Sequence, residues 1–196
     1  MLVMPQGGSY NAFMVSFDPG SVKLGVAIRS FNVYTLETTS TEAFTLDGAK
    51  LMNKHAWINH IHGDRFARID ALRQAIFDVL CQFRPLLITA ESPFFNPGRP
   101  MAFGALTEVL SAIRYAVWDY DAWATLHLID PPTIKKAVGA KGGSGKEIIR
   151  NAVLAMEAQL RYMGKIPLDK LDEHAIDAIA VGEARFKQYV EELCLK

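Results

Sequence analysis

The stretch AFMVSFDPGSVKLGVA, residues 12–27, joins an apolar run, an acid and a chain-breaking turn. Ala12–Phe17 has the length and composition of a buried strand, and Asp18 follows at its carboxyl end. Pro19–Ser21 then ends this strand, and a second strand is expected over 23–29. Asp18 is therefore expected at a fixed place beside exposed backbone, at the end of a buried strand.

Three further side chains are candidates for the same site as Asp18. Glu91 ends a second short apolar run, which Pro85 and Pro93 bound. His174 and Asp177 lie three residues apart in an expected helix and so share one face of it. If all four converge, they would hold divalent cations, which promote phosphodiester hydrolysis. Taken singly, these residues also fit ordinary roles: a turn-forming aspartate, a capping acid and a charged first turn of a helix.

Composition favours one globular domain over residues 1–196, because half of the residues are apolar and the length allows a real core. No apolar stretch approaches the roughly 20 residues that a membrane span needs, so no membrane partner is expected. No signal peptide is evident at the N-terminus. The two cysteines, Cys81 and Cys194, favour a reducing compartment such as the cytoplasm.

Charge is unevenly distributed although the formal net charge is zero. Residues 132–165 carry seven bases against two acids, and residues 169–196 carry seven acids against four bases. This distribution suits a protein that binds phosphates on one side and metal on the other. The alternative is that both segments are solvated surface.

Hydrophobic periodicity predicts an α/β fold, a mixed sheet with helices on both faces. Strands are expected over 12–18, 23–29, part of 33–44, 86–90 and 125–129. Helices are expected over 64–83, 101–118, 131–138, 146–163 and 172–194, with 46–61 irregular and 139–145 a loop. Polar sites collect beyond the carboxyl ends of parallel strands, which is where Asp18 and Glu91 are expected.

Three segments resemble, in order and spacing, the acidic motifs of the RuvC-type Holliday-junction resolvases of the ribonuclease-H-like superfamily. They are FDPGSVKLGVA (17–27), ITAE (88–91) and HAIDAIA (174–180). The resemblance covers nearly the whole chain and implies a ribonuclease-H-like fold with a mixed five-stranded sheet. The first motif alone also resembles the phosphate-binding loop of actin-like ATPases.

The resemblance assigns metal-binding roles by position. Asp18, Glu91 and Asp177 match the family's metal-binding acids, and His174 falls where many members carry a fourth acid and some a histidine. Glu173 is the nearest competitor of His174 as a ligand. The implied cofactor is Mg²⁺, for which Mn²⁺ can substitute, and no nucleotide cofactor is expected.

The resemblance also places DNA-contacting residues. Lys135 and Lys146 fall where the family carries basic residues near the scissile phosphate, and Phe94 matches an aromatic that the family uses against junction bases. With these implied roles and the basic stretch, the expected DNA-binding residues are Phe94, Lys136, Lys141, Lys146 and Arg150.

The function implied is that of a homodimeric crossover junction endodeoxyribonuclease in DNA recombination and repair. Paired nicks in branched DNA, such as a four-way junction, would leave 5′-phosphates and 3′-hydroxyls. Two alternatives stay open: a non-catalytic branched-DNA or RNA-binding protein of the same fold, and an actin-like phosphotransferase.

Four other segments have competing interpretations. The loop before Lys146 is not a P-loop, because its glycine spacing is one residue too long and Glu147 stands where a hydroxyl belongs; it is expected to hold DNA backbone, or to be a plain loop. One of Phe94 and Phe95 is expected in the core. His55, His60 and His62 are expected on a surface loop rather than at zinc. The helix over 101–118 is either core or a subunit-pairing element.

Overall fold

The computed structural model describes residues 10–94, 98, 100–140 and 146–194. Its described strands form one five-stranded sheet of order β3-β2-β1-β4-β5. They are β1 (Asn11–Asp18), β2 (Lys23–Asn32), β3 (Thr38–Asp47), β4 (Leu87–Glu91) and β5 (Leu126–Ile129). The β1–β2 and β2–β3 pairs are antiparallel, whereas β1–β4 and β4–β5 are parallel. The predicted mixed five-stranded sheet is confirmed.

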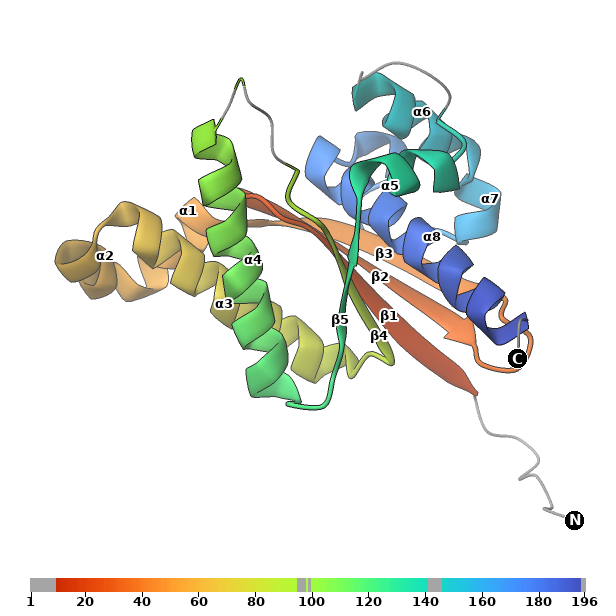
Figure 1. The fold of residues 1–196 in the computed structure, drawn as a ribbon, viewed down its shortest axis with the longest axis horizontal. Helices are drawn as coiled ribbons and strands as arrows, with labels where there is room; N and C mark the ends of the chain where they lie inside the picture. The colour runs from red at the N-terminus through yellow and green to blue at the C-terminus, as the bar shows by residue number, and fades with distance from the viewer. Residues whose placement is uncertain (1–9, 95–97, 99, 141–145, 195–196) are drawn as a thin grey trace, which may run out of the picture.

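Helices cover both faces of this sheet, as predicted (Figure 1). On one side lie α3 and α4, with the short α1, 3₁₀ helix η1 and α2 beside them; on the other lie α5 to α8. Their bounds are α1 (Gly48–Leu51), η1 (Met52–His55), α2 (Ala56–His62), α3 (Asp64–Phe83), α4 (Pro100–Tyr120), α5 (Pro131–Ala137), α6 (Lys146–Ala155), α7 (Glu157–Leu160), η2 (Leu168–Lys170) and α8 (Glu173–Cys194). None of the helices in the described part of the chain is both long and apolar enough to cross a membrane.

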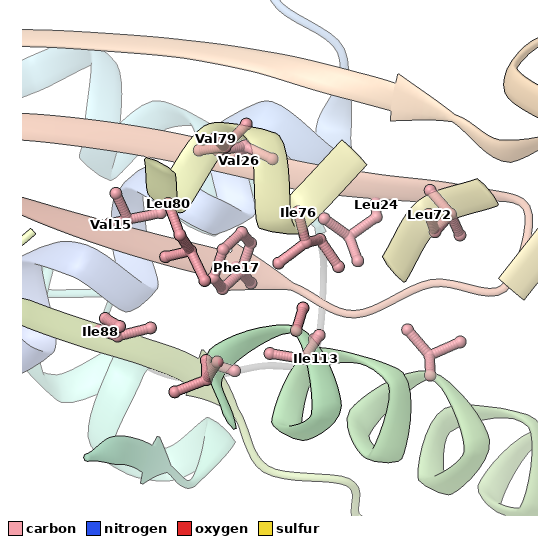
Figure 2. Close-up of a cluster of buried hydrophobic side chains, with 14 of the residues drawn as sticks. Val15, Phe17, Leu24, Val26, Leu72, Ile76, Val79, Leu80, Ile88 and Ile113 are labelled. Atoms are coloured by element: carbon pink, nitrogen blue, oxygen red, sulfur yellow. The ribbon is translucent and has the colours of Figure 1, made fainter. Parts of the chain in front are cut away.

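Alternation along β1 places its buried side chains on the two opposite faces of the sheet. Val15 and Phe17 are fully buried against α3 and α4, together with Ile76, Leu80 and other apolar side chains. Figure 2 shows Phe17 beside Leu80 and Ile76. Because side chains alternate along a strand, the residues between them face the opposite helix layer. The buried first strand holds Asp18 firmly at its carboxyl end.

The opposite face of the sheet carries α8, which packs very close to β1. The hydroxyl of the buried Ser16 donates a 2.8 Å hydrogen bond to the carbonyl oxygen of Ala178 in α8. Gly182 makes this approach possible, because a β-carbon there would meet the Ser16 hydroxyl oxygen at 2.7 Å. This contact fixes the height of α8 above the strand that carries Asp18.

Two predicted segments differ from the observed structure. Residues 46–61 were expected to be irregular, but they form the end of β3 and then helical turns, with the Asp47 carboxylate accepting from the Lys50 backbone N–H. The single helix expected over 146–163 is broken at Met156. The break turns the chain so that Tyr162 pairs with Thr41 at the outer edge of β3.

Candidate active site

Strand register brings the first two candidate acids together. Phe17 of β1 pairs with Ala90 of β4 in parallel, so Asp18 and Glu91 are the next residues on neighbouring strands. Glu91 also pairs with Ile129 at the end of β5. Both acids therefore lie at the carboxyl edge of the parallel strands, as the sequence predicts.

The start of α8 brings His174 and Asp177 to this edge of the sheet. The Asp172 carboxylate caps α8, accepting a 3.1 Å hydrogen bond from the Ala175 backbone N–H. The same carboxylate oxygen accepts a 2.5 Å hydrogen bond from the Thr45 hydroxyl of β3. These two bonds tie the first turn of α8 to the sheet.

Asp18 and His174 are in direct contact. The Nδ1 atom of His174 lies 2.8 Å from Oδ2 of Asp18, although 156 residues separate them in the chain. The hydrogen bond to Asp18 raises the pKa of His174, against the smaller opposing effect of burial. Glu173 approaches the other ring nitrogen, with Oε1 3.8 Å from Nε2. His174 therefore lies between Asp18 and Glu173.

The pKa of Glu91 is strongly raised. Burial, followed by the negative charges of Asp18 and Asp177, raises its pKa from 4.5 to about 8, while Lys135 lowers it. These influences place Asp18, Asp177 and Lys135 within electrostatic range of Glu91. When its carboxylates are ionised, the site therefore carries an excess of negative charge.

Two small cavities flank Glu91. One, of about 140 Å³, is lined by Asp18 and Glu91 together with Phe94 and Leu106. The other, of about 190 Å³, is lined by Glu91, Asp177 and Lys135. Glu91, at the end of β4, therefore has room for solvent-sized groups on both sides.

The donor set fits a hard divalent cation. Mg²⁺ prefers carboxylate oxygens, and Glu91 is buried beside the negative charges of Asp18 and Asp177, which a bound cation would offset. A neutral imidazole at His174 can serve as a further ligand. Within the described residues, no three histidine, cysteine, aspartate or glutamate side chains are already close enough to hold a metal ion. Asp18, Glu91, Asp177 and His174 are the residues that would hold it.

The predicted basic and aromatic residues lie at different distances from this cluster. Lys135 of α5 lines the cavity beside Asp177, and Lys136 is exposed on the same helix. Phe94 is 66% exposed at the mouth of the first cavity. Lys141, Phe95 and the side chain of Lys146 lie outside the described part of the structure.

Arg150 makes contacts within the protein, and its predicted role as a DNA contact stays a prediction. Its guanidinium donates 2.9 Å and 2.5 Å hydrogen bonds to the backbone carbonyls of Leu171 and Asp169. Arg150 thus ties α6 to the segment that leads into α8.

The structure also bears on two further predictions, the place of the histidines and the role of the helix over 101–118. His60 and His62 are exposed, but they lie on helix α2 rather than on a loop; the side chain of His55 is not described. Core packing accounts for much of α4, where the buried side chains are Val109, Leu110, Ala112, Ile113, Ala116 and Val117.

Sequence reasoning missed Asp172, Thr45 and Gly25 as residues that place the site. Asp172 was recognisable as a capping aspartate directly before a helix. Gly25 pairs with Asp18, and a β-carbon there would overlap the carbonyl oxygen of His174. Only the fold shows this close approach, because the two positions are far apart in the chain.

Solved structures share this fold. The RuvC structure of Thermus thermophilus aligns with a TM-score of 0.61 at 18% identity, over 91% of this chain and 96% of RuvC. The same protein in complex with Holliday junction substrate gives 0.59 at 16% identity, with the same coverage. The yeast mitochondrial Holliday junction resolvase Ydc2 gives 0.58 at 11% identity, over 91% of this chain and 80% of Ydc2. No family model and no curated protein sequence matches the chain.

The chain therefore has the ribonuclease-H-like fold found in the RuvC-type resolvases. The resemblance seen in the three acidic motifs is confirmed at the level of the fold. At these identities the comparison concerns the fold and leaves the chemistry to be argued from the site.

Proposed function

We propose that this protein is a divalent-metal-dependent endonuclease that cuts branched DNA such as a four-way junction. The observation that carries the proposal is the convergence of Asp18, Glu91, Asp177 and His174 at the carboxyl edge of β1 and β4. Support also comes from the shared fold, since a protein of this fold was solved in complex with Holliday junction substrate.

The chain's own residues divide the work in this proposal. Asp18, Glu91, Asp177 and His174 would hold Mg²⁺ or Mn²⁺, which supplies an activated water and neutralises charge on the leaving oxygen. Lys135, beside Glu91 and Asp177, would stabilise the negative phosphate held next to three carboxylates. The exposed Phe94 at the cavity mouth would stack on an unpaired base.

A second copy of the chain is part of the proposal. The outer face of α4 exposes Met101, Tyr115 and Trp118, and a groove of about 620 Å³ lies between α3 and α4. Apolar surface of this kind marks protein contacts, and a two-fold dimer matches the two-fold symmetry of a four-way junction. We propose that the dimer forms through this face, which we call the α3–α4 face.

Cleavage of a synthetic four-way junction tests the nuclease directly. Incubation with Mg²⁺ should give nicked duplexes with 5′-phosphates. Asp18→Asn should reduce the cleavage rate at least about 100-fold while junction binding persists. Asp78→Asn, an exposed α3 position bonded to Gln74, is the matched control and should cut like the wild type.

Two results would overturn the nuclease proposal. Cleavage that continues unchanged in Asp18→Asn would place the chemistry elsewhere. Junction binding without cleavage in Mg²⁺ or Mn²⁺ would instead support a non-catalytic binding protein of the same fold.

A further inference from the structure

A buried charge cluster joins β2 to α8 away from the acidic site. Arg29 NH2 lies 2.5 Å from Glu183 Oε2, and the two side chains are only 6% and 9% exposed. Arg29 also lies over the ring of Phe186 at 4.6 Å. A buried ion pair contributes little net stability compared with apolar side chains in its place. Stability alone therefore does not explain this cluster.

Lys187 connects this cluster to α5. Its Nζ atom lies 3.3 Å from the second carboxylate oxygen of Glu183 and donates a 2.6 Å hydrogen bond to the carbonyl oxygen of Ala137. Ala137 is the last residue of α5, where helix carbonyls lack partners within the helix. A cation at this end also complements the helix dipole.

α5 depends on such contacts for its position. It has seven residues, too few for a helix to be stable in isolation. Its first turn is capped by Asp130, whose carboxylate accepts from the Thr133 backbone N–H at 3.0 Å. Lys187 holds the opposite end, and Ile134 packs between α5 and α8.

Lys135 lies on α5 two residues before the carbonyl that Lys187 holds. Its side chain reaches the cavity shared with Glu91 and Asp177. A shift of the carboxyl end of α5 would therefore move Lys135 relative to the acidic cluster. Reacting groups tolerate little such displacement, since about 1 Å can reduce a rate by about 100-fold.

We infer that Lys187 and Glu183 are positioning residues that fix α5 and thereby set the place of Lys135 at the acidic cluster. This inference rests on the proposed function for its rate effects, but the tether itself is a property of the fold. Neither residue touches the phosphate; both act through α5.

The test replaces Lys187 with Met, which keeps the aliphatic stem and removes the charge. Lys187→Met should reduce kcat for junction cleavage by about 10-fold with KM little changed, and Lys187→Arg should restore most of it. In a Lys135→Met background, Lys187→Met should cause no further loss, because its effect passes through Lys135. Lys50→Met, an exposed lysine of α1, is the matched control and should leave kcat unchanged.

Hydrogen exchange of the amides in 131–138 supplies a readout that needs no nuclease activity. Lys187→Met should increase exchange there and leave β1 and α3 unchanged. The inference is overturned if exchange in 131–138 stays at the wild-type level, or if Lys187→Met reduces kcat equally with and without Lys135. A wild type that fails to cut would refute the proposed function, while the exchange result would still decide the tether.

Discussion

At the scale of single residues, the ionised carboxylates of the acidic cluster repel one another, and a bound cation would offset this repulsion. Glu91 lies between Asp18 and Asp177, and their charges add to burial in raising its pKa to about 8. An uncharged residue of the same shape would give a more stable folded protein at this position. Selection for stability alone would therefore rarely keep a glutamate there. A carboxyl group whose ionised form is disfavoured in this way is typical of a functional site.

This charge predicts how the cation-free protein responds to pH. Folded Glu91 keeps its proton up to about pH 8, whereas the unfolded chain loses it near 4.5, so the free energy of unfolding falls as pH rises between these values. The raised pKa of His174 acts in the same direction, because its proton is also held longer in the folded state. Glu91→Gln should raise the free energy of unfolding by on the order of 1–3 kcal/mol at pH 8 and change it little at pH 4.5.

Urea denaturation with EDTA at both pH values measures this effect. Glu191→Gln, on the exposed end of α8, is the control and should show no such pH dependence. A Glu91→Gln variant that is equally or less stable than the wild type at pH 8 would show that ionised Glu91 does not destabilise the folded protein.

At the scale of elements, the position of α8 depends on close backbone approaches to β1 and β2. Gly25 of β2 lies against the carbonyl of His174, and Gly182 of α8 lies against Ser16. The first two turns of α8 carry the candidate ligands His174 and Asp177, so their distance from the sheet sets the width of the site. Small residues at these two crossings are therefore part of the site's construction.

Gly25→Ala should destabilise the fold by at least about 2 kcal/mol and weaken cation binding, because the new methyl group meets backbone that cannot move aside. Gly104→Ala, in the exposed part of α4 with open space around it, should instead raise stability by about 0.5–1 kcal/mol. Thermal unfolding of both variants provides the comparison. A stable Gly25→Ala variant with normal cation binding would refute the close contact of α8 with β2.

The elements with strong local signals were predictable from sequence. The apolar run before Asp18 and the periodic helix ending before Pro85 gave β1 and α3 to within a residue. The turns at 48–62 lack a buried apolar face to reveal them, and no glycine or proline marks the break at Met156. Contacts such as those of Arg150 with Leu171 and Asp169 depend on how the elements pack, so no pattern in the sequence alone predicts them.

The candidate site was predictable to a different degree. Asp18 and Glu91 could be placed because strand ends in a parallel sheet meet at one edge, and their register now shows them as neighbours. The contact of His174 with Asp18 and the tether of Lys187 to Ala137 cross large sequence separations. No local pattern encodes such pairs, and the sequence placed His174 at the site of Asp18 only through the resemblance of whole motifs to those of the resolvases.

At the scale of the whole molecule, the two helical layers have different roles in the proposal. The layer of α5 to α8 carries the candidate ligands His174 and Asp177 and the basic residue Lys135, whereas α3 and α4 expose apolar surface away from the cluster. This division leaves the α3–α4 face available for a second copy while the acidic edge stays open to DNA.

The dimer proposal predicts the effect of a charge on the α3–α4 face. Trp118→Glu should shift the protein from dimer to monomer in sedimentation velocity, because a carboxylate cannot be buried there without a partner. Tyr34→Glu, an exposed aromatic on the β2–β3 connection, is the control and should stay dimeric. A wild type that sediments as a monomer at all concentrations would refute the dimer.

The account depends most on whether the converging side chains bind a divalent cation. Calorimetric titration of Mn²⁺ into the wild type at pH 7.5 should show saturable binding with proton release, because Glu91 must ionise as the cation enters. Asp18→Asn should weaken that binding at least about 10-fold. Absence of binding to the wild type, or identical binding to Asp18→Asn, would contradict the site at the ends of β1 and β4.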